Sequence, residues 1–242
     1  VKKFTNLGFS INIEKSYADH LNINDDDYKM SGANIVSSKK EILEKSDIIL
    51  KVNNPSVGEA NLIKNKSILI GQFDVNHIEE VIDILNKKQV SFFSLNLLPR
   101  ITRAQSMDVL SSQANLAGYK AVIESFSKFK KAVPMMMTAA GTIPAAKVLI
   151  IGAGVAGLQA IATAKRMGAI VFATDVRAAS KEQVESLGGK FLTVKSSENL
   201  ETEGGYAKEV SEEFKKKQED LLSETLKKID IVICTALIPG KK

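Results

Sequence analysis

Three glycines at fixed spacing form the part of the chain best suited to chemistry. Gly152, Gly154 and Gly157 give the pattern G-x-G-x-x-G directly after the apolar run 148–151. In this pattern the first glycine allows a tight turn, the second lets a pyrophosphate approach the backbone, and the third lets the following helix pack closely on the strand. A helix N-terminus also presents free N–H groups and a positive dipole end to phosphates. The pattern predicts a dinucleotide-binding turn.

An acidic residue ends the next apolar run, 169–174. Asp175 lies near the usual separation of about 20 residues from the glycine turn, and its carboxylate can accept hydrogen bonds from both hydroxyls of an adenosine ribose. Its charge would repel a 2′-phosphate, so the sequence favours NAD over NADP. Arg177 offers the opposite chemistry, because a basic residue just past this strand can serve a 2′-phosphate. With Asp175 in place, we expect Arg177 to be solvated or to face the adenine.

The elements that must position these residues are visible around them. A G-x-G-x-x-G alone is weak evidence, but here a strand precedes it, a helical pattern follows it, and an acid ends the next strand. Further strands alternate with helical patterns along the whole chain, which predicts parallel, doubly wound sheets. We expect an α/β protein with two Rossmann-like domains, residues 1–109 and 110–242, and a cleft between them.

Both domains look shortened. The chain opens with a helical segment, VKKFTNLG, that no strand precedes, and only about four strands of the second sheet can be counted where such a fold usually has about six. We therefore expect the first domain to lack its first strand and the second domain to lack its last strands.

Composition excludes several classes of protein. The net charge is +5, but the lysines are scattered among acids, without a basic stripe carrying aromatics, so nucleic-acid binding is not expected. No apolar run approaches the roughly 20 residues that span a bilayer, and no signal-peptide pattern opens the chain, which predicts a soluble polypeptide. His20 and His77 have no cysteine or carboxylate at ligand spacing, so we expect no metal site. The single cysteine, Cys234, lies in an apolar run and is expected to be a small buried residue.

A polar cluster precedes the long helical pattern that begins near residue 109. Arg100, Gln105 and Asp108 together offer donors and acceptors that could grip a carboxamide and a ribose. The alternative is a surface pair of Arg100 with Asp108, with Gln105 as a bystander, and composition does not separate the two. The helix that follows is rich in small residues, which permit close approach of a neighbouring element or of a ligand. Those residues are Ser111, Ser112, Ala114, Ala117, Gly118 and Ala121.

The remaining segments have less specific signals. Met135, Met136 and Met137 are expected to fill the core, and residues 141–144 to form a turn. The polar stretch 195–205 beside Tyr206 has the composition of a hinged lid with an aromatic tip, or of a surface loop without a role.

Two later features lie near the same predicted site. Gln218 interrupts a helical apolar stripe formed by Val210, Phe214, Leu222 and Leu226, so it lies either at the edge of the core or facing a site. Thr235, Ala236 and Leu237 follow the last strand and fall on the same sheet edge as the glycine turn.

Several motifs closely resemble one family in particular. They are PRITRAQSMD (99–108), TAAGTIPAAKVLIIGAGVAGLQAIATAKRMGA (138–169), TDVR (174–177), EGGYAKE (203–209) and TALIPGK (235–241). They resemble the NAD(H)-binding domain of the α subunit of proton-translocating NAD(P) transhydrogenases. The resemblance is dense from about Pro99 to the C-terminus and looser before it.

The resemblance implies a function and a set of residues. The family passes hydride between NADH and an NADP held by a partner domain, coupled to proton translocation through a membrane domain. It implies a homodimer docked peripherally on a membrane, either the cytoplasmic face of a bacterial inner membrane or its mitochondrial equivalent. The residues it implies for nicotinamide positioning are Arg100, Gln105, Ser106, Met107 and Asp108, supported by Ser111 and Tyr119. Those implied for the rest of NAD are Gly152, Gly154, Val155, Gly157, Asp175, Val176, Arg177, Gly205, Tyr206, Ala207, Gln218, Thr235, Ala236 and Leu237.

Two other functions remain open from the sequence. Alanine dehydrogenases share this architecture and use a lysine and a histidine, where this chain has Asn53 and Asp74, although Lys51 and His77 lie close by. A binding-only module that senses NAD without chemistry is the third possibility.

Overall fold

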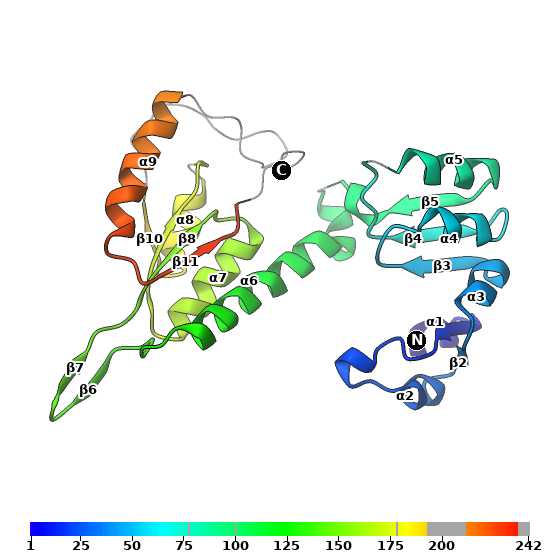
Figure 1. The fold of residues 1–242 in the computed structure, drawn as a ribbon, viewed down its shortest axis with the longest axis horizontal. Helices are drawn as coiled ribbons and strands as arrows, with labels where there is room; N and C mark the ends of the chain where they lie inside the picture. Colours follow the sequence, from blue (N-terminus) through cyan, green and yellow to red (C-terminus); the bar gives the residue numbers. More distant parts are fainter. Residues whose placement is uncertain (77, 100, 178, 193–211, 237–242) are drawn as a thin grey trace. The chain divides into compact units, whose positions relative to one another are not determined.

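The computed structural model describes residues 1–76, 78–99, 101–177, 179–192 and 212–236 (Figure 1). The chain divides into two compact units, Val1–Val109 and Leu110–Lys242. Each unit is built from short parallel strands connected through helices. This confirms the predicted α/β class with parallel sheets. None of the helices in the described ranges has the combined length and apolarity that crossing a bilayer requires.

Unit 1 contains two separate parallel sheets. β1 (Ile11–Glu14) pairs with β2 (Ala33–Val36), and β4 (Ile68–Gly71) lies between β3 (Ile48–Lys51) and β5 (Ser91–Ser94). The α-helices of the unit are α1 (Lys2–Asn6), α2 (Asp25–Met30), α3 (Lys39–Lys45), α4 (Val57–Leu62) and α5 (Glu79–Lys87), and the 3₁₀ helices are η1 (Asp19–Leu21), η2 (Leu95–Leu97) and η3 (Thr102–Met107). The core is made by Leu43, Ile49, Ala60, Ile63, Leu69, Phe73, Val81, Leu85 and Val90.

Local sequence signals explain several of these helices. Asn24 caps α2, and its own backbone N–H donates in return to the Asp27 side chain. The apolar spacing of α5 buries Val81 and Leu85 on one face of the helix. Sequence reasoning missed α4, although its signal was available: Ser56 and Glu59 form a capping box in which each side chain accepts the other's backbone N–H.

Unit 2 has one four-stranded parallel sheet in the order β10-β9-β8-β11. Its strands are β8 (Lys147–Ile151), β9 (Ile170–Thr174), β10 (Lys190–Phe191) and β11 (Ile231–Cys234), and its helices are α6 (Val109–Lys128), α7 (Val155–Arg166), α8 (Ser180–Ser186) and α9 (Glu212–Leu226). The chain moves from β8 to β9 to β10 in one direction and then returns to the other side of β8, so β8 and β11 meet where the strand order reverses. In doubly wound sheets this reversal marks the ligand crevice.

The core of unit 2 lies between this sheet and helices α6 and α7. Val148 and Ile150 of β8, Ile161 of α7 and Val122 of α6 are fully buried within it. Gly118 shows why α6 is rich in small residues, because a Cβ atom there would lie 2.1 Å from the carbonyl oxygen of Ala156 in α7. Gly118 therefore allows α7, rather than a ligand, to pack closely against α6 at this position.

The methionine prediction was wrong. Met135, Met136 and Met137 are 49–73% exposed, because β6 (Met136–Thr138) forms an antiparallel two-stranded ribbon with β7 (Gly141–Ile143) rather than a buried linker. Every residue of both strands is exposed. The predicted turn at 141–144 is also misplaced, since residues 139–140 make the turn and 141–143 form a strand.

Two predictions of burial were wrong for a common reason. Cys234 is exposed. The apolar run in residues 47–52 likewise predicts a buried strand, but its Leu50 is 63% exposed. Among the described strands, β11 and β3 are each at the edge of their sheet. Alternate side chains of a strand point to opposite faces of the sheet, so every second side chain can point away from the face that helices cover. Ile233 and Ile49, each one residue away from these positions, are buried instead.

Candidate dinucleotide-binding site

Two of the three glycines are required by the protein's own packing. Gly152 has φ of +94°, and a Cβ atom there would approach the backbone nitrogen of Ala236 to 2.8 Å. A Cβ atom on Gly157 would lie 1.8 Å from the carbonyl oxygen of Gly152. The turn from β8 into α7 can therefore form only with glycine at both positions.

Gly154 is different, because no atom of the described residues requires it. Its φ and ψ of −76° and −168° are open to other residues, and within the described ranges a Cβ atom there would meet nothing within 4 Å. Gly154 is also the N-cap of α7, and no side chain of the described residues caps the helix there. The N–H groups at this end of α7, which begins at the exposed Val155, are the kind of donors that bind phosphates.

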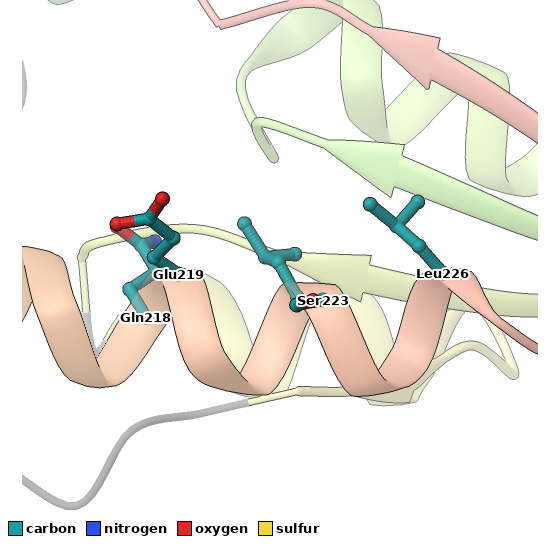
Figure 2. Close-up of a pocket in the computed structure, with 5 residues that line it drawn as sticks. Gln218, Glu219, Ser223 and Leu226 are labelled. Carbon is teal, nitrogen blue, oxygen red and sulfur yellow. The ribbon is translucent and has the colours of Figure 1, made fainter.

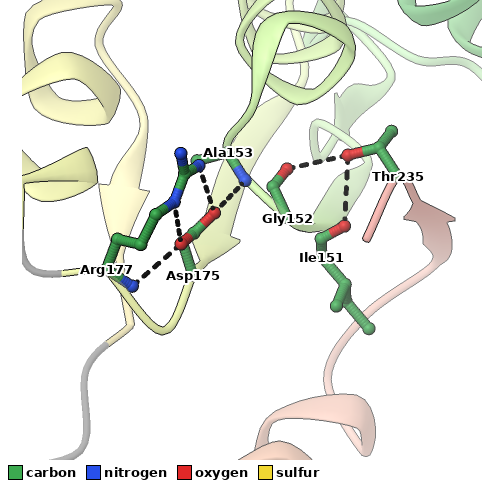
Figure 3. Close-up of polar contacts among 6 residues, drawn as sticks. All are labelled: Ile151, Gly152, Ala153, Asp175, Arg177 and Thr235. Carbon is green, nitrogen blue, oxygen red and sulfur yellow. Dashed lines mark hydrogen bonds and ion pairs between the residues drawn. The ribbon is translucent and has the colours of Figure 1, made fainter. Parts of the chain in front are cut away.

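The end of β11 is fixed beside this turn. The Thr235 hydroxyl donates to the carbonyl oxygen of Gly152 at 2.8 Å (Figure 3). The backbone N–H of Thr235 donates to the carbonyl oxygen of Ile151 at 2.8 Å. The backbone N–H of Gly152 in turn donates to Thr174 at the end of β9. The glycine turn is therefore held between the ends of the two strands that flank β8.

Asp175 is the best-connected polar residue of the site. One carboxylate oxygen, Oδ2, accepts the backbone N–H of Ala153 at 2.7 Å and Nη2 of Arg177 at 2.9 Å. The other, Oδ1, accepts the backbone N–H and Nε of Arg177, both at 2.9 Å (Figure 3). The Ala153 contact ties the carboxylate to the glycine turn itself. Sequence reasoning missed it, because a backbone donor leaves no mark on residue types.

These contacts set the charge of Asp175. Burial acts to raise the pKa of this carboxyl, whose side chain is only 7% exposed. The hydrogen bonds from the Arg177 side chain and from the backbone N–H groups of Arg177 and Ala153 outweigh burial, so the pKa lies below its ordinary value. The solvated alternative for Arg177 is wrong, because its guanidinium is paired with Asp175 and its side chain is only 20% exposed. The alternative that Arg177 faces the adenine stays a prediction.

Two residues of the polar cluster, Gln105 and Asp108, lie in and directly after the 3₁₀ helix η3. Gln105, Ser106 and Met107 are exposed residues of η3, and Asp108 follows as its half-buried C-cap. Short-range backbone hydrogen bonds, such as the one from the Asp108 N–H to the Gln105 carbonyl oxygen three residues earlier, close this segment. Ser111 in the first turns of α6 is half-buried, and Tyr119 is 48% exposed.

Gln218 lies on the half-buried face of α9. It lines a hollow of about 330 Å³ together with Glu219, Leu222, Ser223 and Leu226, all from this one helix (Figure 2). No residue of the glycine turn lines this hollow, so it is not the dinucleotide site by itself. Leu226, predicted to belong to the buried stripe, is 43% exposed.

Several predicted residues lie outside the described part of the chain. They are Arg100, Gly205, Tyr206, Ala207 and Leu237. Val176 is half-buried between Asp175 and Arg177, and Ala236 is exposed. Among the described residues, no three His, Cys, Asp or Glu side chains are grouped as a metal site requires.

The region that would distinguish an alanine dehydrogenase lies after β3 and β4. The ammonium of Lys51 is 3.4 Å from the carboxylate of Glu59, which also pairs with Lys39 at 2.5 Å. Further along, the Asn54 side chain donates to the carbonyl oxygen of Asp74 at 2.8 Å, while Asp74 itself accepts from Asn76. Lys51, Asn54 and Asp74 are thus each engaged in contacts within unit 1.

The parallel sheet, the glycine turn at the N-terminus of α7 and the carboxylate after β9 are together typical of Rossmann-type folds that bind dinucleotides. Residues 121–242 match the family "Alanine dehydrogenase/PNT, C-terminal domain", and residues 1–117 match its N-terminal domain. The chain belongs to the alanine dehydrogenase/PNT family.

Individual relatives place the chain within this family. It is 51% identical over 248 residues to the first section of the NAD(P) transhydrogenase subunit alpha of Rhodospirillum rubrum, covering 100% of this chain and 65% of the relative. The crystal structure of transhydrogenase from Sinorhizobium meliloti is 45% identical with a TM-score of 0.83, over 99% of this chain and 64% of that one. An L-alanine dehydrogenase structure matches with a TM-score of 0.74 over 100% of this chain and 61% of that one, but at 19% identity it shows the fold alone. The chain thus spans less than two thirds of the length of these relatives, between 61% and 65%.

Proposed function

We propose that this protein is the NAD(H)-binding component of a proton-translocating NAD(P) transhydrogenase. It would pass hydride between NADH and an NADP held by a partner domain, and a membrane domain would couple the transfer to proton translocation. The observation that carries the proposal is the 51% identity to a transhydrogenase α subunit across the whole of this chain. The glycine turn and Asp175 supply a site with the chemistry that NAD needs.

The reaction demands orientation more than acid–base chemistry. Hydride transfer between two nicotinamide rings creates no alkoxide, so no general acid or base has to act. In this proposal Arg100, Gln105 and Asp108, with Ser106 and Met107, orient the nicotinamide and its ribose. Gly205, Tyr206 and Ala207 form a lid that excludes water, and Gln218 and Leu237 contact the cofactor.

The described residues also support NAD as the bound form. α7 begins at Gly154 with its N–H groups uncapped by side chains, which suits the pyrophosphate. Asp175 lies at the end of β9, where the adenosine ribose of NAD binds in such folds. Its low pKa keeps it anionic at neutral pH, and an anion disfavours the 2′-phosphate of NADP.

The partners follow from the same family relationship. We infer an NADP-binding subunit or domain and a membrane-spanning subunit, because the relatives are named as α subunits. We also infer a homodimer, docked peripherally on the cytoplasmic face of a bacterial inner membrane or the mitochondrial equivalent.

Alanine dehydrogenase is the second candidate, and the contacts in unit 1 weigh against it. The lysine and histidine of those enzymes correspond here to Asn53 and Asp74. Lys51, the nearest substitute, is held against Glu59, whose pKa of about 2 keeps it a charged partner. A binding-only NAD module differs from both candidates by showing NADH binding without transfer to any acceptor.

Nucleotide preference tests the proposed site. We expect Asp175→Asn to weaken NADH binding about tenfold or more, because the neutral amide accepts hydrogen bonds from the two ribose hydroxyls less well than a carboxylate does. NADPH binding should weaken less, because the amide does not repel the 2′-phosphate. Fluorescence titration with NADH and NADPH measures both, and NADH emission is easily isolated because the chain has no tryptophan. Asp47→Asn is the matched control, since Asp47 is 85% exposed in unit 1. An unchanged ratio of the two affinities would show that Asp175 does not read the ribose.

A further inference from the structure

All the hydrogen-bonding positions of the Asp175 carboxylate are engaged by the protein itself. A carboxylate offers about four acceptor sites on its two oxygens, and here four N–H groups donate to them. Two donors are backbone groups, of Ala153 and Arg177, and two belong to the Arg177 guanidinium. A ribose whose two hydroxyls donate to this carboxylate must therefore take over positions that the guanidinium holds.

We propose that Arg177 is a specificity-determining residue that competes with the ribose diol for Asp175. The inference rests on the proposed NAD(H) site and adds a function for a residue in it. Binding of the cofactor exchanges the two guanidinium bonds for two hydroxyl bonds, and the cost of this exchange sets how much affinity the hydroxyls contribute.

The two kinds of donor to Asp175 differ in whether they can leave. The N–H groups of Ala153 and Arg177 belong to the glycine turn and to the turn after β9, so they stay in place and keep the carboxylate oriented. The guanidinium is carried on a long side chain with several rotatable bonds. The Arg177 side chain is 20% exposed, whereas that of Asp175 is 7% exposed. The side-chain bonds are thus the exchangeable pair.

The guanidinium also resembles a diol in the way it binds. Its Nε and Nη2 each donate to a different oxygen of Asp175, both at 2.9 Å (Figure 3). The vicinal hydroxyls of a ribose also present two adjacent donors, so they can replace the guanidinium one for one. A 2′-phosphate dianion is an acceptor only and cannot make this replacement. The exchange therefore admits NAD(H) and rejects NADP(H) for a reason additional to charge repulsion.

The test compares nucleotides with and without the two hydroxyls. We would titrate the protein with 5′-AMP and 2′,3′-dideoxy-AMP by calorimetry, for wild type and Arg177→Ala, and with NADH in parallel. We expect Arg177→Ala to bind AMP about three- to tenfold more tightly, because the hydroxyls no longer displace a charge-assisted pair. Binding of dideoxy-AMP should stay unchanged, so the affinity ratio of the two nucleotides rises by the same factor.

Two further variants complete the design. Arg177→Lys keeps the charge but cannot bridge both oxygens, so we expect a ratio between those of wild type and Arg177→Ala. It also replaces Arg177→Ala in the comparison if that variant has a lowered melting temperature. Arg166→Ala is the matched control, because Arg166 is an exposed arginine in the last turn of α7, and its ratio should equal that of wild type.

The outcomes separate this inference from the proposed function. Equal weakening of AMP and dideoxy-AMP by Arg177→Ala would show that the arginine contacts the nucleotide directly, and an unchanged ratio would show that it does not compete for Asp175. Either result overturns the inference while NADH binding by wild type leaves the proposed function standing. No NADH binding by wild type overturns both.

Discussion

At the scale of single residues, the three glycines of the turn have different causes. Gly152 and Gly157 are needed because backbone atoms lie where their Cβ atoms would be, 2.8 Å and 1.8 Å away. Among the described atoms, none lies within 4 Å of a Cβ atom built on Gly154, and its backbone conformation is ordinary. A structural demand therefore explains two glycines, and for the third we propose a ligand that needs close access to the backbone.

Alanine substitutions distinguish glycines needed for the fold from a glycine needed for ligand binding. Gly157→Ala should destabilise the protein by about 3 kcal/mol or more, because the Gly152 carbonyl cannot move without breaking the turn. Gly154→Ala should change the unfolding free energy by less than about 1 kcal/mol and yet weaken NADH binding about tenfold or more, since the new methyl group occupies the pyrophosphate position. Chemical denaturation and NADH titration measure the two effects. If Gly154→Ala bound NADH as wild type does, the pyrophosphate would not lie against this residue.

At the scale of elements, the crossing of α6 and α7 positions the start of α7. Gly118 lets the backbone of α6 approach Ala156, one residue into the first turn of the glycine-turn helix. The Asn115 side chain donates to Gln159 at 3.3 Å, and Gln159 bonds Thr163 within α7. Because Ala156 lies within the predicted phosphate-binding turn, α6 supports that turn at the crossing with α7.

A methyl group at the crossing should therefore affect both stability and binding. Gly118→Ala places a Cβ atom 2.1 Å from the Ala156 carbonyl oxygen, so we expect a loss of about 1–3 kcal/mol in unfolding free energy. NADH affinity should fall as well, since α7 must shift. Ala117→Ser, at the exposed neighbouring position, is the control and should change neither. A fully stable Gly118→Ala variant would mean that the two helices do not cross this closely.

A second element-scale feature is the ion cluster of unit 1. Glu59 in α4 joins Lys39 of α3 and Lys51 of β3, and its carboxylate also accepts the Ser56 N–H. Burial acts to raise the pKa of Glu59, but the hydrogen bonds from Lys39 and Ser56 and the charges of the two lysines lower it to about 2. Three elements are thus linked through one carboxylate.

This low pKa predicts a pH dependence of stability. Because folding depresses the pKa of Glu59 from 4.5 to about 2, its contribution is present above pH 4.5 and is lost as the pH falls through this interval. After discounting for solvent around the half-exposed Lys39, we expect about 1–2 kcal/mol. Glu59→Gln should lower the unfolding free energy by this amount at pH 7 and by little at pH 2.

The control for this prediction is a surface pair. Glu41 pairs with Lys45 one helical turn away and is 49% exposed, so Glu41→Gln should have an effect below about 0.5 kcal/mol at either pH. Urea denaturation at the two pH values measures all three proteins. A Glu59→Gln effect that is the same at pH 7 and pH 2 would contradict the predicted pKa shift.

Local signals made most elements predictable. The capping residue Asn24, the apolar spacing of α5 and the glycine turn each act within a few residues, and the structure confirms the elements they indicate. The β6–β7 ribbon was not predictable, because Met135 and the ribbon residues Met136 and Met137 have the apolar side chains of core residues. Their exposure follows only once the core is known to be formed by other residues. Exposure of Cys234 likewise depends on where β11 lies in its sheet, which no local pattern encodes.

At the scale of the whole molecule, the fold class and the family were predictable from sequence, and the pairing within the site was not. Asp175 and the glycine turn could be located because their spacing is fixed by a strand and a helix between them. That Arg177 and Ala153 together surround Asp175 depends on side-chain and backbone geometry after the strand ends. The roles of Gln105 and Asp108 from unit 1, and of Tyr206, remain predictions that the resemblance supports.

We propose that this protein passes hydride from NADH to a nucleotide held by a partner. The most direct measurement mixes it with a purified NADP-binding transhydrogenase domain and follows hydride transfer from NADH to an NADP analogue. We predict transfer that requires both proteins, together with no reduction of NAD in the presence of alanine. Absence of transfer combined with alanine-dependent NAD reduction would contradict the claim and identify an alanine dehydrogenase instead.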